Sequence, residues 1–231
     1  MQAIKTITLS LPFRFGIVNC YLVTTANGFV LLDTGTSSKR EELESELASA
    51  GCKPGALDLI ILTHGDFDHT GNAAYLRDKF GTKIAMHQDD SGMAKHGDMF
   101  WNRSSGSAVI RKIAPILYGF SKANRFVPDL YVEDGYDFSE FGFDAQALTI
   151  PGHSKGSIGF LTAAGDLFCG DLFENTDKPA TNSIMDDPEA CAASIERLQG
   201  FEINTVYPGH GKPFPMDAFI TTRQMICKEE A

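Results

Sequence analysis

The sequence lacks any hydrophobic stretch long enough to cross a membrane, and its first residues predict no secretory signal. A membrane-spanning helix needs about 18 or more consecutive apolar residues, and no part of the 231-residue chain approaches that length. The first residues, MQAIKTITLS, contain no cationic segment followed by a long apolar one. We therefore expect a protein that binds no membrane and acts in the cytoplasm.

The sequence also has few cysteines, and fewer positively than negatively charged residues. The five cysteines are scattered and never form a CxxC pair, which excludes a disulfide framework and is typical of a reducing compartment. Lys and Arg number 20 against 30 Asp and Glu, so the formal net charge is −10. Such a chain repels nucleic-acid phosphates. We expect a small-molecule substrate and no nucleic-acid partner, while the oligomeric state stays open.

Low-complexity segments and short repeats are absent too, and the 231 residues fit a single domain. Segments follow the order strands, helices, strands, helices, which predicts an α+β fold with two sheets between helical layers. Residues from about 89 to 125 differ in character and predict short helices that form a lid-like insertion. Their apolar side chains would either line a substrate pocket or simply pack on the sheets.

Local signals mark several helices. Ser38 and Glu41 fit a capping box, which predicts the start of a helix at this point. Apolar spacing predicts further helices over residues 72–80 and 188–198.

The densest cluster of chemically active side chains lies in residues 63–71, THGDFDHTG. This segment follows a short apolar strand-like run and contains two imidazoles and two carboxylates. Imidazole and carboxylate together suit Zn²⁺, Fe or Mn²⁺. If the loop is extended, His64, Asp66 and Asp68 converge, and His69 falls on the other side, where it would suit a second metal.

Three later segments have the same construction, an apolar strand-like run that ends in a candidate ligand beside glycine. They are PGHS with His153, GD with Asp171 and PGHG with His210. Glycine lets the backbone approach a ligand closely. The four segments together predict one metal centre built from His64, Asp66, Asp68, His69, His153, Asp171 and His210.

With these segments, and with NCY at 19–21 and LLDTG at 31–35, the sequence resembles the metallo-β-lactamase superfamily, and within it the glyoxalase II-like hydrolases. The similarity covers most of the chain and implies an αββα four-layer sandwich. It also implies the division of the ligands. One metal would take His64, Asp66 and His153, the other would take Asp68, His69 and His210, and Asp171 would bridge them.

Asp66 departs from the usual HxHxDH motif of this superfamily, which has histidine at this position. A carboxylate is a harder, anionic ligand, so it raises the tolerance of the site for Fe or Mn²⁺. Flavodiiron proteins of the same superfamily carry a carboxylate here, so the exchange is compatible with two metals. We expect two divalent metal ions, zinc first, with iron or manganese as alternatives because of Asp66.

The resemblance implies a metal-dependent hydrolase. Two ions about 3.5–4 Å apart would share a hydroxide, formed from water whose pKa is lowered toward roughly 7. This metal-bridging hydroxide would cleave a small ester-type substrate, namely a thioester, a lactone or a phosphodiester. Asp68 is the expected catalytic residue, because it can orient the nucleophile and shuttle its proton. Ser-His-Asp catalysis is not supported, since the chain has no GxSxG elbow.

Two other functions stay open. Asp66 favours an iron-dependent oxidoreductase on the same fold, either sulfur dioxygenase-like with one iron or di-iron. A non-catalytic metal-binding or sensing module would use the same ligands without a reaction.

Residues outside the ligand set have simpler interpretations. Asp33 is expected to accept hydrogen bonds from turn amides. Cys169 is expected to be a buried strand cysteine. His87 and His96 have no partner motif and are expected to lie at the surface or behind the ligands.

Overall fold

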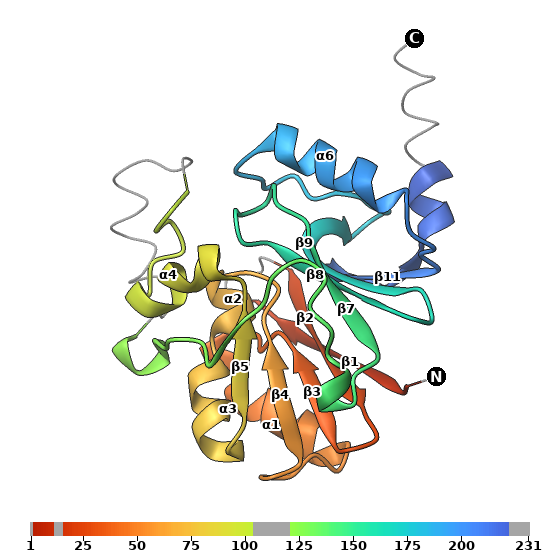
Figure 1. Cartoon of the computed structure of the whole chain (residues 1–231). Coiled ribbons are helices and arrows are strands. Elements are labelled where there is room, and N and C mark those ends of the chain that lie inside the picture. The colour runs from red at the N-terminus through yellow and green to blue at the C-terminus, as the bar shows by residue number, and fades with distance from the viewer. Residues whose placement is uncertain (1, 12–15, 104–120, 222–231) are drawn as a thin grey trace.

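The computed structural model describes residues 2–11, 16–103 and 121–221. Two β-sheets pack face to face, and helices cover the outer face of each (Figure 1). This arrangement confirms the predicted α+β sandwich of four layers. Residues 104–120, most of the second half of the predicted lid-like insertion, lie outside the described residues. No helix among the described residues is long and apolar enough to cross a membrane.

The first sheet contains the amino-terminal strands in chain order. These strands are β1 (Ile4–Ser10), β2 (Ile17–Thr24), β3 (Phe29–Leu32), β4 (Leu57–Ile61), β5 (Lys83–Met86) and β6 (Leu130–Tyr131). The strands β1 to β3 are antiparallel neighbours, and β3 to β6 are parallel. Parallel strands align their carboxyl ends, so loops that follow them meet at one edge of the sheet.

The second sheet has the order β12-β11-β9-β8-β7, with β10 paired to β9. Its strands are β7 (Ala145–Thr149), β8 (Ile158–Thr162), β9 (Asp166–Asn175), β10 (Ala180–Thr181), β11 (Thr205–Gly211) and β12 (Phe214–Pro215). Only β9 and β11 are parallel neighbours among these described strands, and their register shifts on both sides of Pro208. Such irregularities redirect side chains, and here they lie directly before His210.

The helices lie outside the two sheets and at the edge where the ligand loops meet (Figure 1). They are α1 (Arg40–Ser49), α2 (Phe67–Thr70), α3 (Ala73–Phe80), α4 (Gln88–His96) and α6 (Pro188–Leu198), with short 3-10 helices at Ser37–Lys39, Lys122–Asn124 and Ser139–Phe141. The two helices predicted over 72–80 and 188–198 are confirmed. In α6, the Asp187 side chain accepts a hydrogen bond from the Ala190 amide, as an N-cap does.

The capping box predicted at Ser38 and Glu41 is wrong. Ser38 lies in a 3-10 helix before α1, and its hydroxyl is hydrogen-bonded to that of Thr36 at 2.9 Å. The residue that precedes α1 is Lys39, and it makes no side-chain cap. The extra turn moves the serine away from the amides that it would have capped.

The core divides into layers that follow the alternation along each strand. On β2, Cys20 and Leu22 belong to the cluster beneath α1 and α3, whereas Tyr21 and Val23 belong to the cluster between the sheets. A third cluster packs the outer face of the second sheet against α6. Each fully buried large apolar side chain contributes roughly 1.5–3 kcal/mol. The two sheets are thereby held in fixed relation, and the loops between them can place side chains accurately.

Candidate metal centre

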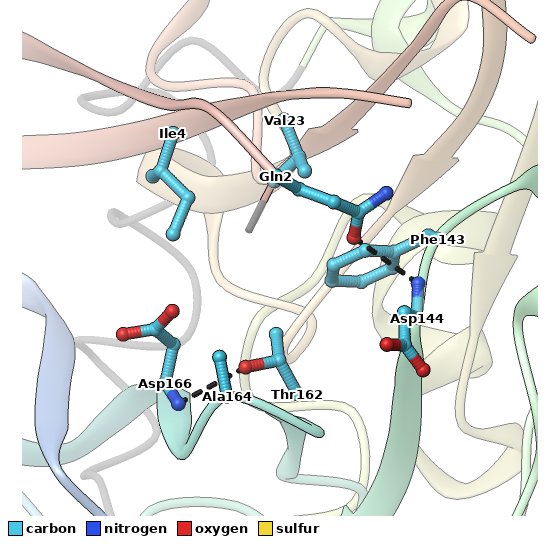
Figure 2. Close-up of a pocket in the computed structure, with 8 residues that line it drawn as sticks. All are labelled: Gln2, Ile4, Val23, Phe143, Asp144, Thr162, Ala164 and Asp166. Atoms are coloured by element: carbon cyan, nitrogen blue, oxygen red, sulfur yellow. Dashed lines mark hydrogen bonds between the residues drawn. The ribbon is translucent and has the colours of Figure 1, made fainter. Parts of the chain in front are cut away.

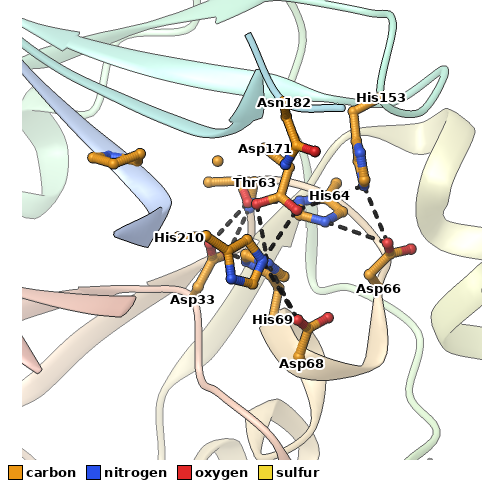
Figure 3. Close-up of polar contacts among 12 residues, drawn as sticks. Asp33, Thr63, His64, Asp66, Asp68, His69, His153, Asp171, Asn182 and His210 are labelled. Atoms are coloured by element: carbon orange, nitrogen blue, oxygen red, sulfur yellow. Dashed lines mark hydrogen bonds and ion pairs between the residues drawn. The ribbon is translucent and has the colours of Figure 1, made fainter. Parts of the chain in front are cut away.

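The structure brings all seven predicted ligands together at the edge between the two sheets (Figure 3). Four of them, His64, Asp66, Asp68 and His69, come from the segment that runs from the end of β4 into α2. His153 follows β7, while Asp171 lies on β9 and His210 on β11. The group therefore combines side chains from both sheets, and most of it is buried.

One half of the centre consists of His64, Asp66 and His153, here called the first triad. The Asp66 Oδ2 lies 3.1 Å from His153 Nε2 and 3.7 Å from His64 Nε2. One ligand atom from each of the three residues lies within 4.8 Å of the others. A single cation could therefore contact all three.

The other half consists of Asp68, His69 and His210, here called the second triad. The Asp68 Oδ2 lies 3.6 Å from His210 Nε2 and 4.0 Å from His69 Nε2. The Asp171 carboxylate faces both triads, because Oδ1 lies 3.3 Å from His69 Nε2 while Oδ2 lies 3.2 Å from His210 Nε2 and 3.9 Å from His153 Nε2. The two triads contain the same residues as the two ligand sets that the sequence resemblance implied, with Asp171 between them.

Each of the four histidines is held through Nδ1, so that Nε2 faces the centre. The partners are Thr63 Oγ1 for His64 at 2.9 Å, Asp33 Oδ2 for His69 at 2.8 Å, the Ile184 carbonyl for His153 at 2.7 Å and the Ile17 carbonyl for His210 at 2.5 Å. Metal-binding histidines typically have such partners, which fix the tautomer and the ring orientation.

Asp33 orients two of these histidines, which is more than the sequence predicted. Its carboxylate accepts the Thr63 amide at 2.9 Å and the Thr63 hydroxyl at 2.8 Å. It also accepts His69 Nδ1–H, so it holds His69 directly and His64 through Thr63. Asp33 has a φ of 57°, a left-handed conformation that is uncommon outside glycine. A strained backbone conformation of this kind persists only where the surrounding contacts hold it in place.

Asp90 is a positioning residue that no sequence motif pointed to. It lies on α4, is fully buried, and accepts hydrogen bonds from the Gly65 amide at 3.0 Å and the Ser154 hydroxyl at 2.6 Å. Its other oxygen accepts the Gly156 amide at 2.8 Å. One carboxylate thus joins the loop of His64 and Asp66 to the loop that carries His153.

Arg103 also enters the centre without having been predicted. Its Nη2 lies 2.9 Å from Asp66 Oδ1 and 3.2 Å from His153 Nε2. The side chain comes from the segment predicted as a lid-like insertion, where its only sequence signal is a single basic residue among polar ones.

At the centre, burial and neighbouring charges of opposite sign shift the pKa values of the carboxylates and imidazoles in opposite directions. Burial alone would raise the pKa of the Asp66 carboxyl, but Arg103 and the neighbouring histidines hold this pKa well below its usual range. The pKa of Asp171 is lowered in the same way against burial, by His210 and His69. For the imidazole of His210, burial and the neighbouring charge shift the pKa in the opposite directions. Burial lowers the pKa of His210, but Asp171 outweighs it and raises this pKa to about 9.

Several buried polar atoms at the centre have no hydrogen-bond partner among residues 2–11, 16–103 and 121–221. They include His64 Nε2, His69 Nε2 and Asp171 Oδ1. A buried polar atom left unsatisfied costs about 1–3 kcal/mol, so this concentration of such atoms needs an explanation. Nitrogen and carboxylate donors that converge on one point fit divalent zinc, iron or manganese. The fold and the site define a metal-binding protein built on two packed sheets.

Comparison with known proteins agrees with this class. Residues 13–210 match the metallo-beta-lactamase superfamily, and the chain belongs to this superfamily. It is 24% identical over 241 residues to the probable metallo-hydrolase YqjP of Bacillus subtilis, a match that covers 92% of this chain and 72% of that protein. It is 28% identical over 160 residues to hydroxyacylglutathione hydrolase GloC of Haemophilus influenzae, a match that covers 67% of this chain and 69% of that protein.

Solved structures show the same fold. The crystal structure of TTHA1623 in a di-iron-bound form has a TM-score of 0.72 and 27% identity, and the match covers 94% of this chain and 98% of that one. The metallo-beta-lactamase family protein TTHA1429 from Thermus thermophilus also has a TM-score of 0.72, with 23% identity and coverage of 98% of this chain and 79% of that one.

Other candidate residues take structural roles. The His87 Nδ1 accepts the Asp89 amide at 3.3 Å and so caps α4, and His96 stacks on Trp101 with ring centroids 3.8 Å apart. Cys169 is buried, as expected, and burial raises the pKa of its thiol. None of these residues belongs to either triad.

A small hollow between the amino-terminal strands and the β8–β9 hairpin contains no candidate ligand (Figure 2). Its volume is about 90 Å³ and its lining residues include Gln2, Phe143 and Asp166. Pockets for small molecules usually measure roughly 300–1,000 Å³. This hollow is therefore smaller than a typical small-molecule site.

Proposed function

We propose that this chain is a hydrolase that uses two divalent metal ions to cleave a small ester-type substrate, such as a thioester, a lactone or a phosphodiester. The observation that carries the proposal is the pair of triads on either side of Asp171. The first triad with Asp171 would hold one ion, and the second triad with Asp171 would hold the other. The ions would supply an activated water at neutral pH and polarise the bond to be cleaved.

Asp68 is the residue we propose for proton transfer. Its side chain is 12% exposed, more than the 7% of Asp66 or of Asp171, so it is the carboxylate of the centre most open to solvent and substrate. A carboxylate in this position can orient a nucleophilic water and later give up its proton. The remaining ligands are fixed from behind through Nδ1 or by buried partners, and their role is to hold the ions.

The low solvent exposure of the centre supports catalysis as well as binding. His64, His69 and His153 are at most 3% exposed. Electrostatic interactions gain strength where water is excluded. We propose a small-molecule substrate and a single domain that provides the complete site. The name of the relative GloC supports a thioester as the first substrate class to test.

The test is a screen of chelator-treated protein reconstituted with Zn²⁺, Mn²⁺ or Fe²⁺. Thioesters, lactones and bis(p-nitrophenyl) phosphate represent the three substrate classes. We expect metal-dependent hydrolysis in at least one class, lost on His69→Ala and retained on His96→Ala, which changes an exposed histidine outside both triads. Full activity of the His69→Ala variant would contradict the proposal.

An iron-dependent oxidoreductase is the second candidate. Two observations favour iron, namely the carboxylate Asp66 in the first triad and the di-iron-bound form of TTHA1623. Protein purified without added metal separates the two functions. Bound iron with oxygen consumption would support the oxidoreductase, whereas ester cleavage without oxygen consumption would support the hydrolase. Metal binding with neither activity would leave a non-catalytic metal-binding module.

A further inference from the structure

A buried guanidinium lies against the first triad. The Arg103 side chain is only 4% exposed, and its Nη2 is within hydrogen-bond distance of both Asp66 Oδ1 and His153 Nε2. Arginine stays protonated in proteins. The first triad therefore contains a fixed positive charge supplied by the chain itself.

The contact with Arg103 and a bound metal ion would both need the same atom, His153 Nε2. The Nδ1 of His153 is engaged with the Ile184 carbonyl, so Nε2 is the nitrogen left for a metal. The same Nε2 faces Arg103 at 3.2 Å. Nε2 also lies 3.1 Å from Asp66 Oδ2. A metal ion bound to Nε2 would take the lone pair of this nitrogen and would repel the adjacent guanidinium. Arg103 must release His153 before this residue can complete a metal site.

Asp66 does not have the same conflict, because its two oxygens face different neighbours. Oδ1 faces Arg103 at 2.9 Å, whereas Oδ2 faces His153 at 3.1 Å and His64 at 3.7 Å. Asp66 can thus bind a metal through Oδ2 while it keeps Arg103 on Oδ1. In that arrangement the guanidinium neutralises the carboxylate and lowers its attraction for a divalent ion.

The second triad has a different electrostatic setting. Within the described residues, the ion pairs of Asp68 and Asp171 are all with histidines. Of the two triads, the first is the one that has to overcome a permanent cation.

We propose that Arg103 makes the two halves of the centre unequal, by competing with the metal ion for the first triad. The second triad with Asp171 then loads first and tightly, and the first triad loads last and weakly. Arg103 is a positioning residue that sets the order and the affinity of metal loading. This inference rests on the two-ion centre proposed above.

The test is a calorimetric titration of the chelator-treated 231-residue chain with Zn²⁺, in the presence of a competing chelator. The wild-type chain should show a tight and a weak step. Arg103→Gln removes the charge and should tighten the weak step by at least tenfold, since a divalent ion then meets an unpaired carboxylate, and should leave the tight step unchanged. Arg103→Lys keeps the charge and should stay closer to wild type.

Arg125→Gln is the matched control, because it removes an exposed arginine outside the centre and should leave both steps unchanged. In the Arg103 and Arg125 variants the tight step also reports whether the protein is folded. Two further variants assign the steps without changing Arg103. His153→Ala should abolish only the weak step, and His210→Ala should abolish the tight one.

The outcomes separate this inference from the proposed function. If two ions bind but Arg103→Gln leaves the weak step unchanged or weakens it, the role of Arg103 is wrong and the two-ion centre stands. The same holds if His153→Ala removes the tight step. If wild type and Arg103→Gln both bind a single ion, the two-ion proposal fails together with this inference. One ion in wild type and two in Arg103→Gln would be its strongest support.

Discussion

The Asp33 carboxylate lies 2.8 Å from His69 Nδ1 and turns the other nitrogen of that ring toward Asp171. The same carboxylate holds Thr63, whose hydroxyl accepts the Nδ1–H of His64. One residue with left-handed backbone geometry therefore orients a histidine in each triad.

Asp33→Asn should weaken metal binding about 10- to 100-fold, the usual effect of removing a partner behind a metal ligand. Asparagine tolerates the left-handed conformation, so the turn should survive. Its side chain offers one acceptor oxygen in place of two, so it cannot serve Thr63 and His69 together. The measurement is the Kd for Zn²⁺. Asp134→Asn, which changes an exposed carboxylate, is the control, and equal affinities in the two variants would refute the role of Asp33.

Asp90→Asn should lower the free energy of unfolding by about 1–3 kcal/mol, because buried donors lose an acceptor. The carboxylate serves Gly65, Ser154 and Gly156 at once, and an amide cannot accept at both of its ends. Denaturant unfolding gives the measurement. Asp89→Asn changes the exposed neighbour on the same helix and should stay within about 0.5 kcal/mol of wild type. A similar small change in Asp90→Asn would show that the network does not stabilise the fold.

Gly209→Ala should disrupt the centre without removing any ligand. A Cβ at this position would overlap Asp171 Oδ1 and would lie 2.7 Å from the His69 ring. Either side chain has to move, so metal affinity should fall by more than tenfold, about 1.4 kcal/mol of binding free energy. Gly200→Ala is the matched control, because the nearest atom to its Cβ would lie 3.4 Å away. Wild-type affinity in Gly209→Ala would mean that the two ligands are not packed as described.

The metal-free protein should lose stability as the pH rises from about 6.5, the ordinary pKa of histidine, toward 9. Burial lowers the pKa of His210, but Asp171 raises it to about 9 in the folded chain. The pKa values of His69 and His153 are also raised against burial, by carboxylates that include Asp171 and Asp66. A raised pKa stabilises the fold below the unfolded value, and this contribution is lost as the pH passes the folded one.

Unfolding in denaturant with a chelator, at several pH values across this window, gives the measurement. The decline should be shallower in His210→Gln, which has no imidazole to titrate. A stability that rises between these pH values would contradict the upward direction of the three histidine pKa shifts. With Zn²⁺ present the trend should reverse in part, because metal binding displaces protons from the same imidazoles and grows stronger with pH.

The seven candidate ligands could be picked out from the sequence because they occur in short contiguous motifs. THGDFDHTG and PGHS follow the ends of β4 and β7, as expected, whereas Asp171 and His210 lie within β9 and β11 and not after them. The packed sheets bring all four segments to one edge. Helix α6 could also be predicted, because its apolar spacing is a local signal.

Residues that act across the fold could not be found in this way. Asp90 reaches Gly65, which is 25 positions away, and Gly156, which is 66 positions away, and nothing in its local sequence distinguishes it from Asp89. Arg103 looks like any surface arginine until its side chain is seen against Asp66. The capping box failed for a related reason, since a 3-10 turn consumed the residues that the motif needed.

The most direct test of the two-ion centre is anomalous diffraction from crystals grown with Zn²⁺ in excess, measured on both sides of the zinc absorption edge. Two peaks are predicted, one bounded by His64, Asp66 and His153 and the other by Asp68, His69 and His210, with Asp171 within coordination distance of both. Peaks at neither triad, in crystals that hold zinc elsewhere on the protein, would contradict the account.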